Sequence, residues 1–365
     1  MKEYRDRICI AIVGLVFASL VFAAWVLPPK EFSDSERRKL AQFPEFSLAA
    51  VRDGSFVEKF ERYAQDQFPM RDTFRTVKAF LAYDMYRQLD NNGIYLQGGY
   101  AAKLEYPLDE DSVHHAADRF GYIYENFLVD KNVKAYVSIV PDKGYFLAGK
   151  NGYLGMDYEK LFSIMQDRMP YAAYIDICGT LDISDYYRTD THWRQERIVD
   201  AAEKIAAGMG SAFSVKYIQR ALERPFYGVY YGQSSLPLPA ETIYYLTNDV
   251  LDGCKVTNYE EGTVGGIYDM DKAAGRDPYE IFLSGARSLM TIENPDCENG
   301  RELILFRDSF GSSIAPLLAE GYAKVTLVDI RYLRVDYLDK FLTFDGQDVL
   351  FLFSTSVLNH SETLT

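Results

Sequence analysis

The stretch Leu303-Ile-Leu-Phe-Arg-Asp-Ser-Phe-Gly311 is an apolar run that breaks at a serine. Short runs of Leu, Ile and Phe are typical of strands buried in a parallel sheet. Residues 312–320 are compatible with a helix, so the sequence predicts a strand, a turn at Ser309 and a helix. This shape exposes the serine hydroxyl as a nucleophile. The alternative is that Asp308 and Ser309 only cap the helix, which both residue types favour.

A second segment, Thr189-Asp-Thr-His-Trp193, holds a carboxylate and an imidazole two residues apart. With Ser309 they supply an attacking hydroxyl, a base, and an acid to orient that base. The other three histidines lie in polar segments: His114 and His115 in the polar opening of a probable helix, where a solvated or capping role is expected, and His360 in the polar tail. Two alternatives stay open: Asp190 orients a structural histidine, or the pair binds a cation. Since no His or Cys cluster at ligand spacing lies nearby, we predict no metal and no other cofactor.

The N-terminal residues 8–27 contain no charge. Twenty helical residues span about 30 Å, the thickness of a bilayer core. Basic residues precede this segment, which favours a cytoplasmic N-terminus and an exported remainder. A cleaved signal peptide is the alternative, but Ala23 and Ala24 do not form a small-x-small cleavage site, so we predict a retained single-pass anchor in the cell membrane.

Composition limits the partners. The net charge of -14 argues against nucleic acid and against an anionic lipid surface, because both would be repelled. Cys178, Cys254 and Cys297 would face an oxidising compartment, and a Cys254–Cys297 disulfide is possible without being required by the spacing.

We expect three regions along the chain. Residues 1–28 form a cytoplasmic tip and the transmembrane anchor, and residues 29–110 form a stalk and an N-terminal helical region. Residues 111–365 form an α/β domain with an irregular or β-rich insertion at about 215–300, which is rich in tyrosine and glycine. The expected strands of the α/β domain are 133–140, 173–177, 303–306, 325–328 and 349–353. A helix is expected over Arg194–Met209, ending at Gly208 or Gly210.

Two aromatic stripes at helical spacing lie before the α/β domain. One contains Phe56, Phe60 and Tyr63, and the other runs from Phe74 to Met85. We interpret both as helix faces that pack into a core.

The motifs together resemble the DHHW protein family and the related SGNH hydrolase-like alginate O-acetyltransferases. The resemblance is carried first by Asp190-Thr-His-Trp193 and Arg307-Asp-Ser-Phe-Gly311. Further matching segments occur in the expected order: 37–44, 63–72, 140–143 and 327–332. The resemblance implies an SGNH hydrolase-like three-layer fold with a central, mostly parallel sheet. Arg307 stands where many SGNH members have glycine.

The resemblance also implies roles. Asp190 would be the orienting acid, His192 the base and Ser309 the nucleophile. Such proteins are exported and modify cell-surface polysaccharide, with acetyl groups delivered by a multispanning membrane acyltransferase. We therefore expect an extracytoplasmic O-acetyltransferase, and the alternatives are an acetyl esterase with the same triad or a non-catalytic glycan-binding scaffold subunit.

Four further residues are weaker candidates. The backbone N–H of Ser309 at the start of the following helix is a candidate oxyanion donor, and Phe310 is a further candidate for this role. Gly228 is a candidate second donor, although a turn glycine is the plainer interpretation. Lys143 and Arg331 follow strand ends and are candidates to contact a sugar or acetyl oxygen, with an ion pair inside the fold as the alternative.

Overall fold

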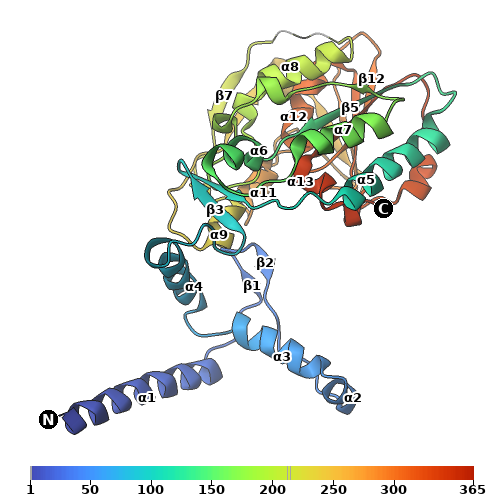
Figure 1. The fold of residues 1–365 in the computed structure, drawn as a ribbon. Coiled ribbons are helices and arrows are strands. Elements are labelled where there is room, and N and C mark those ends of the chain that lie inside the picture. Colours follow the sequence, from blue (N-terminus) through green and yellow to red (C-terminus); the bar gives the residue numbers. More distant parts are fainter. Residues whose placement is uncertain (1, 212, 214) are drawn as a thin grey trace. The chain divides into compact units, whose positions relative to one another are not determined.

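The structure is a computed structural model that describes residues 2–211, 213 and 215–365. The chain folds into two compact units (Figure 1). Unit 1 contains residues 2–91 and the short segment 231–237, and unit 2 contains residues 92–230 and 238–365. The sequence predicted a boundary after residue 110, whereas the structure divides the chain after Asn91.

Unit 1 begins with the long helix α1 (Lys2–Val26). Its stretch Tyr4–Val26 has a mean hydropathy of 2.6 and is not buried by the rest of the described chain. The helix is long and apolar enough to cross a bilayer, as a membrane anchor or a signal sequence is. The remaining elements are β1 (Phe32–Ser33), β2 (Arg38–Lys39), α2 (Leu48–Arg52), α3 (Ser55–Asp66), α4 (Arg71–Phe80) and the π-helical turn η1 (Leu81–Met85).

The aromatic stripes fall on α3 and α4, but they do not face a core. Phe60 is 42% exposed, Phe74 46% and Phe80 59%. The prediction of core faces is therefore wrong for these residues. Periodicity shows that a helix has an apolar face, and it does not show what covers that face.

Unit 2 is built on an eight-stranded mixed sheet with the order β10-β9-β11-β13-β12-β14-β5-β6. The five strands from β13 to β6 are parallel to their neighbours, and β10, β9 and β11 extend the sheet in antiparallel fashion. The strands are β5 (Lys134–Val140), β6 (Ala173–Tyr174), β9 (Lys255–Asn258), β10 (Thr263–Gly265), β11 (Leu289–Glu293), β12 (Glu302–Arg307), β13 (Lys324–Val328) and β14 (Asp348–Ser354). The predicted α/β class is confirmed, and part of the 215–300 segment belongs to the central sheet.

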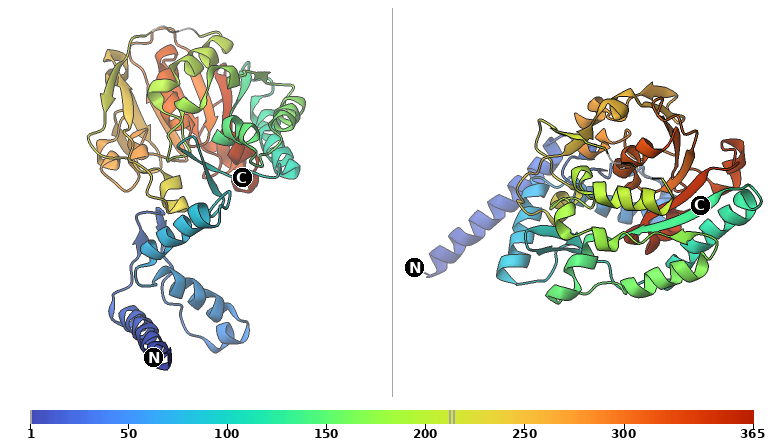
Figure 2. Two further views of the ribbon diagram at one scale, coloured as in Figure 1. Left: turned by 60° about the vertical axis from the view of Figure 1, so that its left-hand side comes forward. Right: turned by 90° about the horizontal axis from the view of Figure 1, so that it is seen from above.

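Side chains alternate across the sheet and create two cores. Leu303 and Leu305 face α8 (Val199–Gly208) and α12 (Gly311–Leu318). Ile304 and Phe306 face the opposite core, with α5 (Glu110–Ile123) and α7 (Tyr158–Arg168). Figure 2 shows the helices on both faces, which completes the three-layer arrangement.

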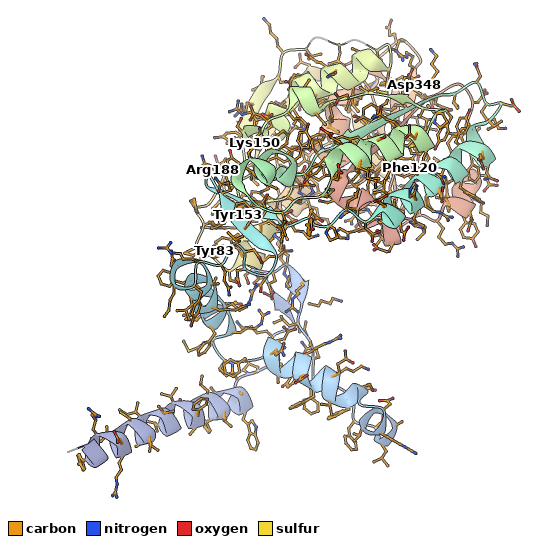
Figure 3. The ribbon with its side chains drawn as sticks, in the orientation of Figure 1. Tyr83, Phe120, Lys150, Tyr153, Arg188 and Asp348 are labelled. Atoms are coloured by element: carbon orange, nitrogen blue, oxygen red, sulfur yellow. The ribbon has the colours of Figure 1, made fainter. Side chains whose placement is uncertain are left out.

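One aromatic cluster illustrates the packing between α5 and the sheet. Phe120, labelled in Figure 3, has its ring centroid 5.0 Å from that of Phe351 and 4.9 Å from that of Phe353. All three side chains are buried to 1% exposure or less. Burial of this kind stabilises each side chain by about 1.5–3 kcal/mol relative to exposure.

The smaller elements of unit 2 lie in its connections. They are the hairpin β3 (Ile94–Gln97) and β4 (Tyr100–Lys103), the hairpin β7 (Ile218–Ala221) and β8 (Tyr244–Thr247), and the short helices α6 (Lys143–Leu147), α10 (Asp249–Gly253), α11 (Met270–Ala273) and α13 (Thr355–Leu358). The short helix α9 (Val229–Ser234) begins in unit 2 and ends in the segment 231–237 of unit 1. The helix expected over Arg194–Met209 is a 3-10 turn, Gln195–Arg197, followed by α8, which ends at Gly208.

The described cysteines are all free thiols, including Cys254 and Cys297, so the possible disulfide is not formed. Cys254 is buried, and burial raises the pKa of its thiol to about 12.

Candidate active site

The candidate site lies where parallel strands end. β12, β13, β14 and β5 are neighbours that run in the same direction, so the segments that follow them emerge at one edge of the sheet. In open α/β sheets, this carboxyl edge is where ligands bind. Ser309 lies between the end of β12 and the start of α12.

The structure brings the three predicted catalytic residues together. His192 Nδ1 lies 2.6 Å from Asp190 Oδ1, and His192 Nε2 lies 2.8 Å from Ser309 Oγ. Because a carboxylate only accepts hydrogen bonds, a neutral His192 carries its proton on Nδ1. Nε2 then accepts the hydrogen bond from the Ser309 hydroxyl, which is the arrangement that activates a serine nucleophile.

Asp190 is held at both carboxylate oxygens. Its side chain is 1% exposed, Oδ1 accepts the backbone N–H of His192 at 3.1 Å, and Oδ2 accepts that of Val229 at 2.9 Å. Backbone donors on a buried carboxylate stabilise its charge and fix its orientation. The position of the acid is therefore set by a segment 39 residues further along the chain.

The His192 ring rests on Tyr279. The two rings are stacked, with centroids 4.0 Å apart and an angle of 10° between planes. The Tyr279 hydroxyl donates to Ser313 Oγ at 2.8 Å, and Trp193 Nε1 donates to the same oxygen at 2.8 Å. Burial raises the pKa of Tyr279 well above its ordinary value, so the hydroxyl stays a neutral donor. Tyr279 was not singled out from the sequence, because 29 tyrosines give no signal for one of them.

Asp308 braces the turn that carries the serine. Its Oδ1 accepts the N–H of Phe310 at 2.9 Å, and its Oδ2 accepts the N–H of Ser354 at 2.8 Å. The Phe310 N–H is thus engaged and is not aimed at a substrate oxygen. This contact contradicts the candidate role of Phe310, and the Ser309 N–H remains the candidate oxyanion donor.

Gly228 also has a different role from the one suggested. Its N–H donates to Thr189 Oγ1 at 2.9 Å, so it is not free for an oxyanion. A Cβ atom at this position would lie 2.3 Å from the backbone N of Asp190 and 2.3 Å from the backbone C of Thr189. The glycine is required because two backbone segments touch here.

Lys143 is buried, with 2% exposure, and is not available to a sugar. Its Nζ donates to the carbonyls of Tyr187 at 3.0 Å and Arg188 at 3.3 Å, and lies 4.8 Å from the centre of the Tyr230 ring. Burial lowers the pKa of Lys143 to about 7. Nearby acids that include Asp190 act in the opposite direction, because they favour the charged form of the lysine. Lys143 therefore fixes the loop that precedes the acid.

Glu241 binds the same loop by accepting hydrogen bonds from the backbone N–H groups of that loop. Its Oε1 accepts the N–H of Arg188 at 2.7 Å, and its Oε2 accepts the N–H and the hydroxyl of Thr189 at 2.7 and 2.6 Å. We use the term triad loop for residues 187–192. Arg188 of this loop is labelled in Figure 3. Long-range contacts of this kind leave no pattern in the local sequence.

Arg331 forms an ion pair inside the fold, which is the alternative that the sequence left open. Its Nε donates to Asp329 Oδ1 at 2.9 Å and its Nη2 to Asp329 Oδ2 at 2.6 Å. Arg307 is fully buried, and its Nη1 lies 3.8 Å from the same carboxylate. Two arginines therefore share Asp329, and Arg331 belongs to an ion-pair cluster inside the fold.

Two of the other histidines have partners elsewhere. His115 Nδ1 lies 2.9 Å from Ser361 Oγ, and His360 Nε2 lies 2.8 Å from Glu105 Oε2.

Comparison with known proteins finds similarity over the region that carries Asp190, His192 and Ser309. Residues 174–328 match the model of the family described as DHHW protein. A DHHW family protein from Eubacterium siraeum superposes with a TM-score of 0.60 at 21% identity, over 75% of this chain and 95% of the other. Bacillus cereus PatB1, in a structure with a sulfonyl adduct, superposes with a TM-score of 0.58 at 17% identity, over 73% of this chain and 97% of the other.

Comparison with curated proteins gives no match. The similarities to solved structures extend over most of the length of those proteins, and at these identities they establish the fold. The family match covers Asp190, His192 and Ser309. Unit 2 therefore has the α/β fold of these solved structures, and the chain resembles the DHHW protein family in the region that carries the candidate triad.

Proposed function

We propose that this protein is a membrane-anchored, extracytoplasmic O-acetyltransferase that acts on a cell-surface polysaccharide through Asp190, His192 and Ser309. The observation that carries the proposal is the hydrogen-bonded chain from Asp190 Oδ1 through the imidazole to Ser309 Oγ, with distances of 2.6 and 2.8 Å. Its members come from segments 117 residues apart. The resemblance to the DHHW family and to O-acetyltransferases supports the reaction class.

In the first half of the reaction, Ser309 Oγ attacks the carbonyl carbon of the acetyl donor. The hydroxyl proton moves to His192 Nε2, and Asp190 stabilises the imidazolium that forms. The carbonyl oxygen becomes an oxyanion, for which the Ser309 N–H is the candidate donor. The intermediate then collapses to acetyl-Ser309 as the donor's leaving oxygen takes the proton from His192.

In the second half, a sugar hydroxyl replaces the leaving group. His192 accepts the proton of the sugar hydroxyl as the sugar oxygen attacks acetyl-Ser309. Collapse of the intermediate then returns the proton to Ser309 Oγ. The products are an acetylated sugar and the free enzyme. If water took the place of the sugar hydroxyl, the same steps would release acetate, and the protein would be an esterase.

The side of the membrane on which the site lies determines which acetyl donor can reach it. If α1 is a membrane anchor with a cytoplasmic N-terminus, residues 30–365 lie where acetyl-coenzyme A is absent. The acetyl group then arrives through a multispanning membrane acyltransferase, and the anchor raises the effective concentration of the site near that partner.

The nucleophile is tested by covalent labelling of the full chain with a sulfonyl fluoride. Ser309→Ala should abolish the label, and Ser356→Ala should retain it as a control, because Ser356 contacts Glu105 and not the triad. Thermal unfolding of both variants checks that the fold is intact. A label retained in Ser309→Ala would show that another residue is the nucleophile.

The reaction is tested by acceptor competition. Wild-type protein is given an activated acetyl ester with an oligosaccharide in water, and acetylated sugar and acetate are measured separately. Transfer in excess of hydrolysis is expected. Acetate alone would favour the esterase, and no turnover with an unlabelled Ser309 would favour the scaffold. In cells, deletion of the gene should lower the O-acetyl content of a surface glycan, and Ser309→Ala should fail to restore it.

A further inference from the structure

The helices α3 and α4 of unit 1 expose their apolar faces. Val57 is 58% exposed, Phe74 46%, Val77 50% and Met85, just after α4, 65%. The exposed side chains continue into the segment before α2, where Phe43 is 60% and Phe46 68% exposed. We use the term phenylalanine face for Phe43, Phe46, Val57, Phe60, Phe74, Val77 and Phe80. Exposed apolar side chains gathered along helix faces in this way mark an interaction site.

Three charged residues near the adjoining ends of α3 and α4 pack within unit 1. Asp66 accepts two hydrogen bonds from Arg38, at 2.8 and 2.6 Å, and the N–H of Ala41 at 2.8 Å. Arg71 and Arg75 both contact Glu36, at 2.5 and 3.1 Å. The side chains of Asp66, Arg71 and Arg75 are only 10–18% exposed.

An amphipathic helix in a water-soluble domain turns its apolar stripe to the core, whereas α3 and α4 leave theirs exposed. The ion pairs of Asp66, Arg71 and Arg75 fix the adjoining ends of the two helices, while charged side chains such as Glu58 and Arg62 on α3 are exposed as well. The exposed apolar faces of these helices therefore suit contact with an apolar environment outside the unit.

The chain itself places that environment close by. Gln67, directly after α3, accepts the N–H of Lys30 at 2.8 Å and donates to the carbonyl of Lys30 at 2.8 Å. Lys30 is four residues after Val26, the last residue of α1. Four extended residues reach at most about 14 Å. The end of α3 is thus fastened within about 14 Å of the end of the segment that is long enough to span a bilayer.

We infer that the phenylalanine face lies in the headgroup and upper acyl layer of the same bilayer that α1 crosses, so that unit 1 is held at a phospholipid surface. This inference rests on the proposed membrane anchor. Helices with an aromatic apolar face and a charged opposite face bind at that depth.

The charges around the face indicate how the surface is recognised. α3 carries Glu58 and Glu61 as well as Lys59 and Arg62, so no single sign dominates. Burial of apolar side chains, and not attraction to anionic lipid, drives the contact. A zwitterionic bilayer is therefore sufficient, and binding should depend little on salt.

The test uses the full chain in phosphatidylcholine vesicles, with p-benzoylphenylalanine in place of Phe60 or of Phe74. Arg62 and Thr76 are the matched control positions, since two residues along a helix turn the side chain to the other face. Ultraviolet irradiation followed by mass spectrometry should show lipid adducts at positions 60 and 74 at least fivefold more abundant than at 62 and 76.

Adducts between two protein chains at positions 60 and 74 would overturn the inference in favour of self-association, and equal lipid labelling at all four positions would also overturn it. Failure of the inference is distinguishable from failure of the proposed function. Sulfonyl labelling of Ser309 reports the site independently, and resistance of the chain to carbonate extraction from the vesicles reports the anchor.

Discussion

The triad loop of unit 2 and the helices α3 and α4 of unit 1 differ in the kind of group that each buries or exposes. In the triad loop, polar groups are buried, and each of the charged groups around it has defined partners: Lys143 on two carbonyls, Glu241 on two N–H groups and Asp190 on two more. In α3 and α4, apolar groups such as Phe60 and Phe74 are exposed. Buried polar contacts demand one geometry, whereas an apolar surface tolerates many. Substitutions should therefore have sharp effects in the first region and mild ones in the second.

The largest effect is expected from Asp190→Asn. An asparagine can donate to His192 Nδ1 and favours the tautomer with its proton on Nε2, which cannot accept the Ser309 proton. The rate of acetyl ester cleavage should fall by about 10³–10⁴-fold. Binding of the uncleaved ester and thermal unfolding should change little. A loss below tenfold would mean that Asp190 only positions a structural histidine.

Gly228→Ala is expected to have the next largest effect. The new Cβ cannot fit 2.3 Å from the backbone at Asp190, so the triad loop must shift. A displacement on the order of 1 Å lowers the rate roughly 100-fold. Gly266→Ala is the matched control, because a Cβ there has no atom within 4 Å. Equal rates in the two variants would show that the contact between the segments does not position Asp190.

Lys143→Met is expected to change the pH dependence of stability. The folded pKa of about 7 lies below the ordinary value of 10.5, so the unfolded chain binds more protons between these values. The contribution of Lys143 to the free energy of unfolding therefore rises with pH from about 7 to about 10, by at most about 1.4 kcal/mol per pH unit. Urea unfolding of wild type and Lys143→Met at pH 7, 8 and 9 measures it.

The variant should lose this slope, while Lys160→Met, at an exposed lysine paired with Glu110, should keep it. Identical slopes in wild type and Lys143→Met would mean that Lys143 stays protonated in the folded protein up to its ordinary pKa.

Phe60→Gln should have the smallest effect. Phe60 is 42% exposed, and substitutions at such positions change the free energy of unfolding by within about 0.5 kcal/mol. Phe306→Ala in the core of unit 2 is the contrast, with an expected loss of about 3–5 kcal/mol. Both are measured by denaturant unfolding in detergent. A large loss in Phe60→Gln would show that the phenylalanine face supports the fold of unit 1.

The sequence was sufficient to predict the α/β class, the long apolar helix and the three residues of the candidate triad. These features have local signals: an apolar run before Ser309, an acid two residues before His192, and an uncharged segment of twenty residues. Their chemical roles follow from residue type, so no tertiary information is needed to nominate them.

The other features of the site and of unit 1 depend on contacts between distant segments of the chain. Tyr279 lies 87 residues from His192, and the Gly228 contact joins two loops that have no shared pattern. The position of Lys143 after a strand suggested an exposed cation, and only the fold shows that its Nζ is enclosed between Tyr230 and two carbonyls. The same limit applies to α3 and α4, where periodicity could not show which face is covered.

The sheet of unit 2 ends in two short strands, β6 with two residues and β10 with three. Long, flat edge strands are templates on which a neighbouring chain can add a strand, and short ones are a common protection against this. Under the proposed anchoring by α1, copies of this protein would meet one another at high local density. The brevity of β6 and β10 would keep crowded copies of this protein from joining edge to edge into fibrils.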